Sequence, residues 1–178
     1  MALNEVESAG DGFIAGTGQP KILYERHIMY RRLRDAGLDA KAAAREHPGL
    51  VNTRPGGYAG GAAEHERLRR ATAIDNTSAY ESASWGAFQV MGYHWEHLGY
   101  SSVQALVDDA RESEAAQLGM LVRFIEADSR LHAALRRHDW PRVAAIYNGP
   151  AYAKNDYDHK LAAAHRRYST MPQHKEVA

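Results

Sequence analysis

Hydrophobic positions recur along most of the chain with the three-to-four-residue spacing of amphipathic helices. The clearest case is Leu118, Leu121, Val122 and Ile125, which repeat at i, i+3, i+4 and i+7 and predict a helix whose apolar side faces a core. The alternation typical of strands is scarce. Helices are expected over residues 25–36, 63–75, 101–110, 129–137, 140–147 and 155–168, and from residue 113 onward. The pattern therefore predicts a mostly α-helical fold.

Three segments depart from this helical pattern. Residues 21–24 predict a short extended piece, and residues 49–61, with five glycines and one proline, predict a long irregular loop of the kind that often binds ligands. Residues 84–92 are aromatic and bounded by glycine, and they could form a turn, the edge of a hairpin or the start of a buried helix. Periodicity alone does not choose among these.

Signals at the expected helix ends support these boundaries. Gly37 is placed to stop the helix over 25–36, and Asp39 to cap a short alanine-rich helix after it. Ser101 with Gln104 forms a capping-box pattern, and Ser113 is the expected cap of the helix that carries the apolar stripe.

Composition indicates an ordinary globular chain. Its 178 residues include 44% hydrophobic and 25% charged residues, so we expect a single domain over residues 1–168 and a loose tail over 169–178. The absence of cysteine excludes a disulfide framework and a thiolate metal site. No apolar run is long enough to span a membrane, and zero net charge argues against a general nucleic-acid binder.

Charge is nevertheless uneven along the chain. Residues 130–167 contain eight cations against three acids, which predicts either solvated helix faces or a positive surface that attracts an anionic polymer. The cations are Arg130, Arg136, Arg137, Arg142, Lys154, Lys160, Arg166 and Arg167.

Candidate chemistry begins with Glu7. A carboxylate in the last turn of a helix faces the negative end of the helix dipole, which tends to raise its pKa and suits a general acid. The alternative is an ordinary surface residue near a chain end. Gln89 beside aromatic residues, and Tyr147 next to Asn148, offer the amides and rings with which proteins hold sugars, although turn and core roles would also explain them.

Four ordered motifs make the chain resemble a known family. Val6–Phe13 is similar to V-E-S-x-G-x-G-F, Pro20–His27 to P-K-I-L-F-E-x-H, Ser82–Gly92 to S-A-S-W-G-x-F-Q-I-M-G, and Tyr147–Asn155 to Y-N-G-P-x-Y-A-K-N. These are motifs of the N-acetylmuramidase domain of modular phage endolysins, related to goose-type lysozymes and lytic transglycosylases. The resemblance implies a lysozyme-like helical domain with a small extended or hairpin region beside the active-site cleft. It also implies cleavage of the β-1,4 bond between N-acetylmuramic acid and N-acetylglucosamine.

Site residues follow from the resemblance, motif by motif. Glu7 would be the catalytic acid, and the second catalytic carboxylate is left open between Glu25 and Glu81. A structural ion pair, for example with Arg26, is the alternative role for Glu25. The expected substrate-binding residues are Ser8, His27, Ser84, Trp85, Gln89, Tyr147 and Asn148.

Several other functions are compatible with parts of this pattern. A lytic transglycosylase would use the same acid and polymer, a glycan-binding module would keep the cleft without catalysis, and a chitinase-like enzyme would cut N-acetylglucosamine polymers. The pair His94 and His97, and His65, do not match a metal motif. We therefore expect no metal or cofactor.

The expected partner is the glycan strand of peptidoglycan, bound by a monomer without membrane insertion. No secretory signal is recognisable, so the protein is expected in the host bacterial cytoplasm, from which it reaches the wall at lysis. Only six residues precede Glu7, whereas members of the family often carry a wall-binding module before this point.

Overall fold

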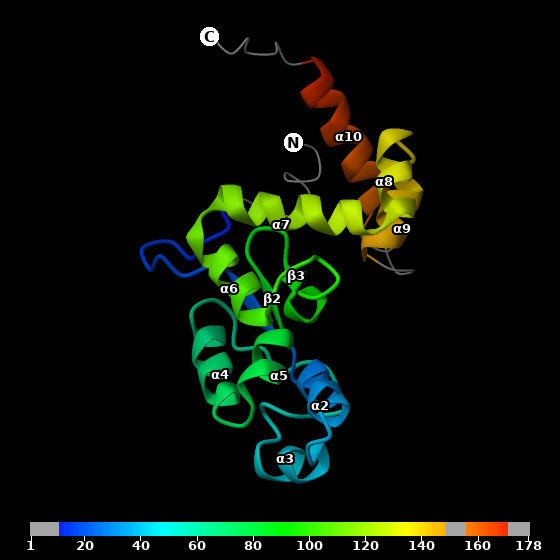
Figure 1. Ribbon diagram of the computed structural model, residues 1–178. Coiled ribbons are helices and arrows are strands. Elements are labelled where there is room, and N and C mark those ends of the chain that lie inside the picture. Colours follow the sequence, from blue (N-terminus) through cyan, green and yellow to red (C-terminus); the bar gives the residue numbers. More distant parts are fainter. Residues whose placement is uncertain (1–10, 149–155, 171–178) are drawn as a thin grey trace. The chain divides into compact units, whose positions relative to one another are not determined.

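A computed structural model describes residues 11–148 and 156–170. The chain divides into two compact units, one over residues 11–127 and one whose described part begins at residue 128 (Figure 1). Glu7 and Ser8 lie outside the described residues. Within the described part, no helix has the length and apolar character needed to cross a membrane.

A small antiparallel sheet lies in the middle of the unit 11–127. Its strands are β1 (Ile22–Tyr24), β2 (Ala83–Trp85) and β3 (Val90–Met91), in the order β1-β2-β3. Ile22 pairs with Trp85, which in turn pairs with Val90. Residues 84–92 therefore form a hairpin that continues into a short 3-10 helix, η1 (Gly92–His94). The sheet brings the start of the unit against a segment about sixty residues later in the chain.

Helices pack around this sheet: α4 contacts β1, α5 contacts β2 and α7 contacts β3 (Figure 1). Their core is built from side chains with almost no exposure, among them Tyr24, Met29, Leu33 and Leu106. The helices of this unit are α2 (Arg26–Asp35), α3 (Ala40–Glu46), α4 (Ala63–Thr72), α5 (Asn76–Glu81), α6 (Val103–Glu112) and α7 (Glu114–Ala127).

Most helix ends follow the sequence signals. Gly37, just after α2, has a φ of 76°, and Asp39 accepts a hydrogen bond from the Ala42 backbone at the start of α3. One expected cap is wrong by a residue. Ser102, rather than Ser101, caps α6 by accepting from the Ala105 backbone, and the side chain of Gln104 turns to Asp108 instead of completing a capping box.

The apolar stripe on α7 is only partly a core face. Leu121 is buried, but Leu118 is 47% exposed and Val122 is 44% exposed. The stripe predicted the helix correctly and the burial of these two residues incorrectly. Periodicity identifies a common side of a helix, whereas burial depends on which elements cover that side.

The second unit contains three helices over its described residues. They are α8 (Ser129–Arg136), α9 (Trp140–Asn148) and α10 (Tyr157–Thr170), and α9 packs against both others. Asp128 caps α8, and its hydrogen bond with Arg130 is the main cause that lowers its pKa to about 2. The expected mostly α-helical fold with a small hairpin region is confirmed, while the single-domain boundary stays a prediction.

Candidate functional site

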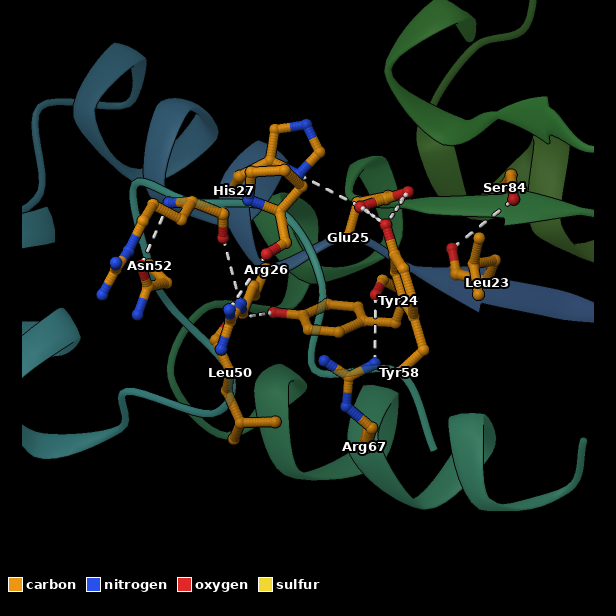
Figure 2. A network of polar contacts seen from close by, with 12 residues as sticks. Leu23, Tyr24, Glu25, Arg26, His27, Leu50, Asn52, Tyr58, Arg67 and Ser84 are labelled. Carbon is orange, nitrogen blue, oxygen red and sulfur yellow. Dashed lines mark hydrogen bonds and ion pairs between the residues drawn. The ribbon is translucent and has the colours of Figure 1, made fainter. Parts of the chain in front are cut away.

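Glu25 lies at the junction between β1 and α2. It is the N-cap residue of α2, but its side chain makes no capping hydrogen bond. Its backbone nitrogen donates to the carbonyl of Ser82, which ties the junction to the residue before β2. The carboxylate therefore makes no bond to the start of the helix and faces the side chains of Tyr58 and His27 instead (Figure 2).

Two side chains contact the Glu25 carboxylate. The hydroxyl of Tyr58 donates to it and lies 3.0 Å from each oxygen. The Nδ1 atom of His27 lies 3.0 Å from Oε2, although it meets no hydrogen-bond geometry with any described residue. Burial, the hydrogen bond to Glu25 and the negative charge of Glu25 together raise the pKa of Tyr58. Tyr58 is therefore a neutral donor in the ordinary pH range.

The loop that carries Tyr58 is held from beneath by Glu64, which is completely buried. Its carboxylate accepts hydrogen bonds from the backbone of Ala59 (2.5 Å), Gly60 (3.0 Å) and Tyr24 (3.2 Å), and from Arg67 (2.7 Å). Burial alone would raise the pKa of Glu64, but these hydrogen bonds and the Arg67 charge outweigh it and lower the pKa. Glu64 thus joins the loop, the strand and α4 at one point.

A second set of bonds fixes the opposite side of the loop. Arg26, the residue after Glu25, donates to the carbonyls of Arg54 and Pro55, and the Tyr24 hydroxyl donates to the carbonyl of Leu50 (Figure 2). Arg26 therefore does not form an ion pair with Glu25, and the residue within ion-pair distance of Glu25 is His27 instead. Four glycines of the loop have φ between 53° and 95°, a range that other residues rarely adopt: Gly56, Gly57, Gly60 and Gly61.

Glu81 has a different environment from Glu25. It is buried at the end of α5, where Oε2 accepts from Arg32 at 2.6 Å and Oε1 accepts from the indole of Trp95 at 2.7 Å. Each of its oxygens therefore already has a partner from another element. This arrangement joins α5 to α2 and to the segment after η1.

The hairpin holds three of the expected binding residues in different ways. Gln89 is exposed, has a φ of 51°, and accepts a hydrogen bond from Ser84 while donating to the carbonyl of Gly86. Ser84 is buried beneath it. Trp85 is only 1% exposed and its indole donates to the carbonyl of Tyr80, so its ring packs in the core and is not open to a sugar. The expected binding role of Trp85 is corrected accordingly.

Gln117 of α7 supports this hairpin from within. It is buried, accepts from the backbone of Ala87, and donates to the carbonyl of Ala110. A Cβ on Gly86 would lie 2.5 Å from the Gln117 side chain, so glycine is required at that position. The hairpin loop and its exposed Gln89 are thus rigidly placed.

The remaining expected site residues belong to the second unit or lie outside the description. Tyr147 is half-buried near the end of α9, and the side chain of Asn148 lies outside the described residues, as do Glu7 and Ser8. Within residues 11–148 and 156–170, no group of three or more His, Asp or Glu side chains could hold a metal ion.

Sequence reasoning missed Tyr58, Glu64 and Arg67. The glycines on either side of Tyr58 were the available signal, because a loop of this kind often places a functional side chain. Glu64 carried no signal, since its helix also contains Glu66, which is exposed.

Comparison with known proteins places the chain in a family. The N-acetylmuramidase family matches residues 1–169. A crystal structure of the Burkholderia AP3 phage endolysin is 54% identical and superposes with a TM-score of 0.91 over 96% of this chain. The chain spans 64% of that endolysin's length. No curated protein matches it. With a family match over nearly its whole length and a fold shared with an endolysin, the chain belongs to the N-acetylmuramidase family.

Proposed function

We propose that the protein is a peptidoglycan hydrolase that cleaves the β-1,4 bond between N-acetylmuramic acid and N-acetylglucosamine. The family match over residues 1–169 carries this proposal, and the similarity to a phage endolysin supports it. The substrate is then the glycan strand of the wall, reached when the host cell lyses.

In this proposal Glu7 is the general acid. Cleavage of a glycosidic bond requires a proton on the leaving oxygen and a group that deals with the cationic sugar. Glu7 is the acid of the V-E-S motif that opens the family resemblance. A carboxyl that keeps its proton near neutral pH can deliver it to the leaving oxygen.

We assign the second carboxylate to Glu25 in preference to Glu81. The oxygens of Glu25 contact only Tyr58 and His27 among the described residues, and both of these can release or adjust a contact when substrate binds. Glu81 is buried and its oxygens are bonded to Arg32 and Trp95. Freeing it would break the contact with half-buried Arg32 and leave a buried carboxylate without its counter-charge, so Glu81 suits a structural role.

Exposed Gln89 is the hairpin residue that we assign to substrate binding. Its amide lies at the surface, and Ser84 and Gly86 hold it in one orientation. A preorganised amide can bond to sugar hydroxyls or to an N-acetyl group at low entropic cost. Tyr147 and Asn148 remain proposed binding residues on the strength of the Y-N motif.

Digestion of purified sacculi followed by mass spectrometry tests this function. Reducing-end muropeptides are expected from the unmodified protein, and near-complete loss of product is expected from Glu7→Gln with its melting temperature unchanged. Anhydro-muropeptides would instead identify a lytic transglycosylase, in which the muramyl 6-hydroxyl attacks.

Variants of the other two carboxylates complete the test. Glu25→Gln should lower the rate of product release with little change in melting temperature, whereas Glu81→Gln should lower the melting temperature. If Glu7→Gln formed muropeptides as fast as the unmodified protein does, the catalytic assignment would be refuted and a glycan-binding module would be favoured.

A further inference from the structure

Tyr58 is an aromatic side chain that the sequence did not single out. The residue is 48% exposed, yet its hydroxyl is bonded to Glu25, which lies 33 positions earlier in the chain. An exposed tyrosine in a glycine-rich loop usually directs its hydroxyl to water. Here the hydroxyl lies 3.0 Å from both carboxylate oxygens (Figure 2).

The position of the loop does not depend on this contact. Glu64 holds the backbone of Ala59 and Gly60 immediately after Tyr58, and Arg26 holds the carbonyls of Arg54 and Pro55 before it. These bonds fix the loop on both sides of the tyrosine. The bond between Tyr58 and Glu25 is therefore an addition to a loop that is anchored at other points as well.

The contact has a clear chemical consequence for Glu25. One hydroxyl shared between two oxygens, with His27 beside one of them, restricts rotation of the carboxyl group about its last bond. The groups that face it are Tyr58 from the loop and His27 from α2, and Arg67 of α4 acts on Tyr58 through its charge. A base or nucleophile acts efficiently only when its oxygens are held in a reactive orientation.

We propose that Tyr58 is a positioning residue for Glu25, which orients that carboxylate for its part in glycosidic bond cleavage. The proposal rests on the proposed function, in which Glu25 is the second carboxylate. Tyr58 acts through Glu25 and transfers no proton itself. The Glu25 side chain keeps 16% of its surface exposed, so part of it can be reached from solvent.

Substitution of Tyr58 by phenylalanine in the full chain tests the proposal. Tyr58→Phe keeps the ring and removes the hydroxyl. Tyr93→Phe is the matched control because Tyr93 is also exposed, lies in η1, and its ring packs against His94. Turnover of soluble muropeptide oligomers should fall about fivefold to tenfold in kcat, which corresponds to about 1.0–1.4 kcal/mol and is the size of one partly exposed hydrogen bond. KM should change less than about twofold. Tyr93→Phe should match the unmodified protein.

The balance between kcat and KM supplies a readout that a purely structural role would not give. A positioning role lowers kcat with little change in KM, because Tyr58 holds Glu25 for the reaction and does not hold the substrate. An unchanged kcat in Tyr58→Phe would overturn the proposal. Melting temperatures of both variants are measured to show that they are folded.

A double-substitution cycle with Glu25 separates positioning from other effects. Adding Tyr58→Phe to Glu25→Gln should cause no further loss in residual activity, because the residue through which Tyr58 acts is already changed. An equal fold-loss in both backgrounds would overturn the proposal. If the unmodified protein releases muropeptides and Glu7→Gln does not, the proposed function stands even when Tyr58→Phe behaves like Tyr93→Phe. If the unmodified protein releases none, both inferences fall.

Discussion

Replacement of Glu64 by glutamine should destabilise the protein more than any other single loss of charge in the loop region. Glu64 has no exposed surface and accepts four hydrogen bonds, one of them from Arg67, which is itself buried. Glutamine keeps the shape but removes the negative charge. The Arg67 guanidinium then remains buried without a counter-charge.

The size of this effect follows from the burial of the pair. Breaking a buried ion pair by changing one partner costs about 3–5 kcal/mol. In a protein of this length each kcal/mol lowers the melting temperature by about 2–4 °C, so a decrease of about 10 °C is expected for Glu64→Gln. Thermal unfolding followed by circular dichroism measures it.

Glu66→Gln on the same helix is the matched control. Glu66 is exposed and pairs with Arg69, so its loss should leave the melting temperature essentially unchanged. Arg67→Met added to Glu64→Gln should restore part of the loss, because no unpaired charge then remains in the interior. Equal melting temperatures for Glu64→Gln and Glu66→Gln would refute the reasoning.

The same residue predicts a dependence of stability on pH. The pKa of Glu64 in the folded protein lies below its ordinary value of 4.5, so its contribution to stability is complete above that value and is lost as the pH falls further. As the pH is lowered from about 5, the free energy of unfolding should therefore decrease less in Glu64→Gln than in the unmodified protein. An identical acid limb in both proteins would contradict this.

Two further perturbations are predicted from local geometry. Gly86→Ala should cost about 2–5 kcal/mol in urea unfolding, because its φ of 72° strains any side chain and the new Cβ would meet Gln117. Gly99→Ala, with a φ of 75° and only an ordinary contact with Arg123 at 3.9 Å, should cost about 1 kcal/mol. Equal costs would show that the contact with Gln117 is unimportant. Burial and the charge of His97 lower the pKa of His94 to about 4, so its neutral form favours folding and stability should decrease by about 2–3 kcal/mol as the pH falls from 6.5 to 4. His94→Gln should flatten this decrease, and a slope that is unchanged in calorimetry would count against it.

Local signals in the sequence accounted for most of the helices. Gly37 and Asp39 marked real ends because capping depends on residues within one turn of each other. Ser101 and Ser102 are adjacent and both suit a cap, so the choice between them depended on backbone geometry that sequence does not contain. The short α5 was missed since its six residues carry too little periodicity.

The candidate site was less accessible to such reasoning. Glu25 matches a family motif and Glu81 lies just before another, which left the second carboxylate open between them, and only their partners distinguish them. Apart from His27, which is two residues from Glu25, those partners lie 14 to 49 residues away in the chain, so no local pattern could connect them. Trp85 was misjudged for a similar reason, because the sequence shows an aromatic residue but not what covers it.

The junction between β1 and α2 has a consequence for protein engineering. Four consecutive residues here contact four different neighbours. Tyr24 donates to the carbonyl of Leu50, and Glu25 accepts from the hydroxyl of Tyr58. Arg26 donates to the loop backbone, and the ring of His27 lies against the Glu25 carboxylate. Insertion of one residue here would rotate the following helix by about 100° and misdirect every one of these side chains together. In a chimera of two lysins, the junction should therefore lie at the turn around Gly37, where a Cβ would meet nothing within 4 Å. Residues 24–27 should come from the same parent.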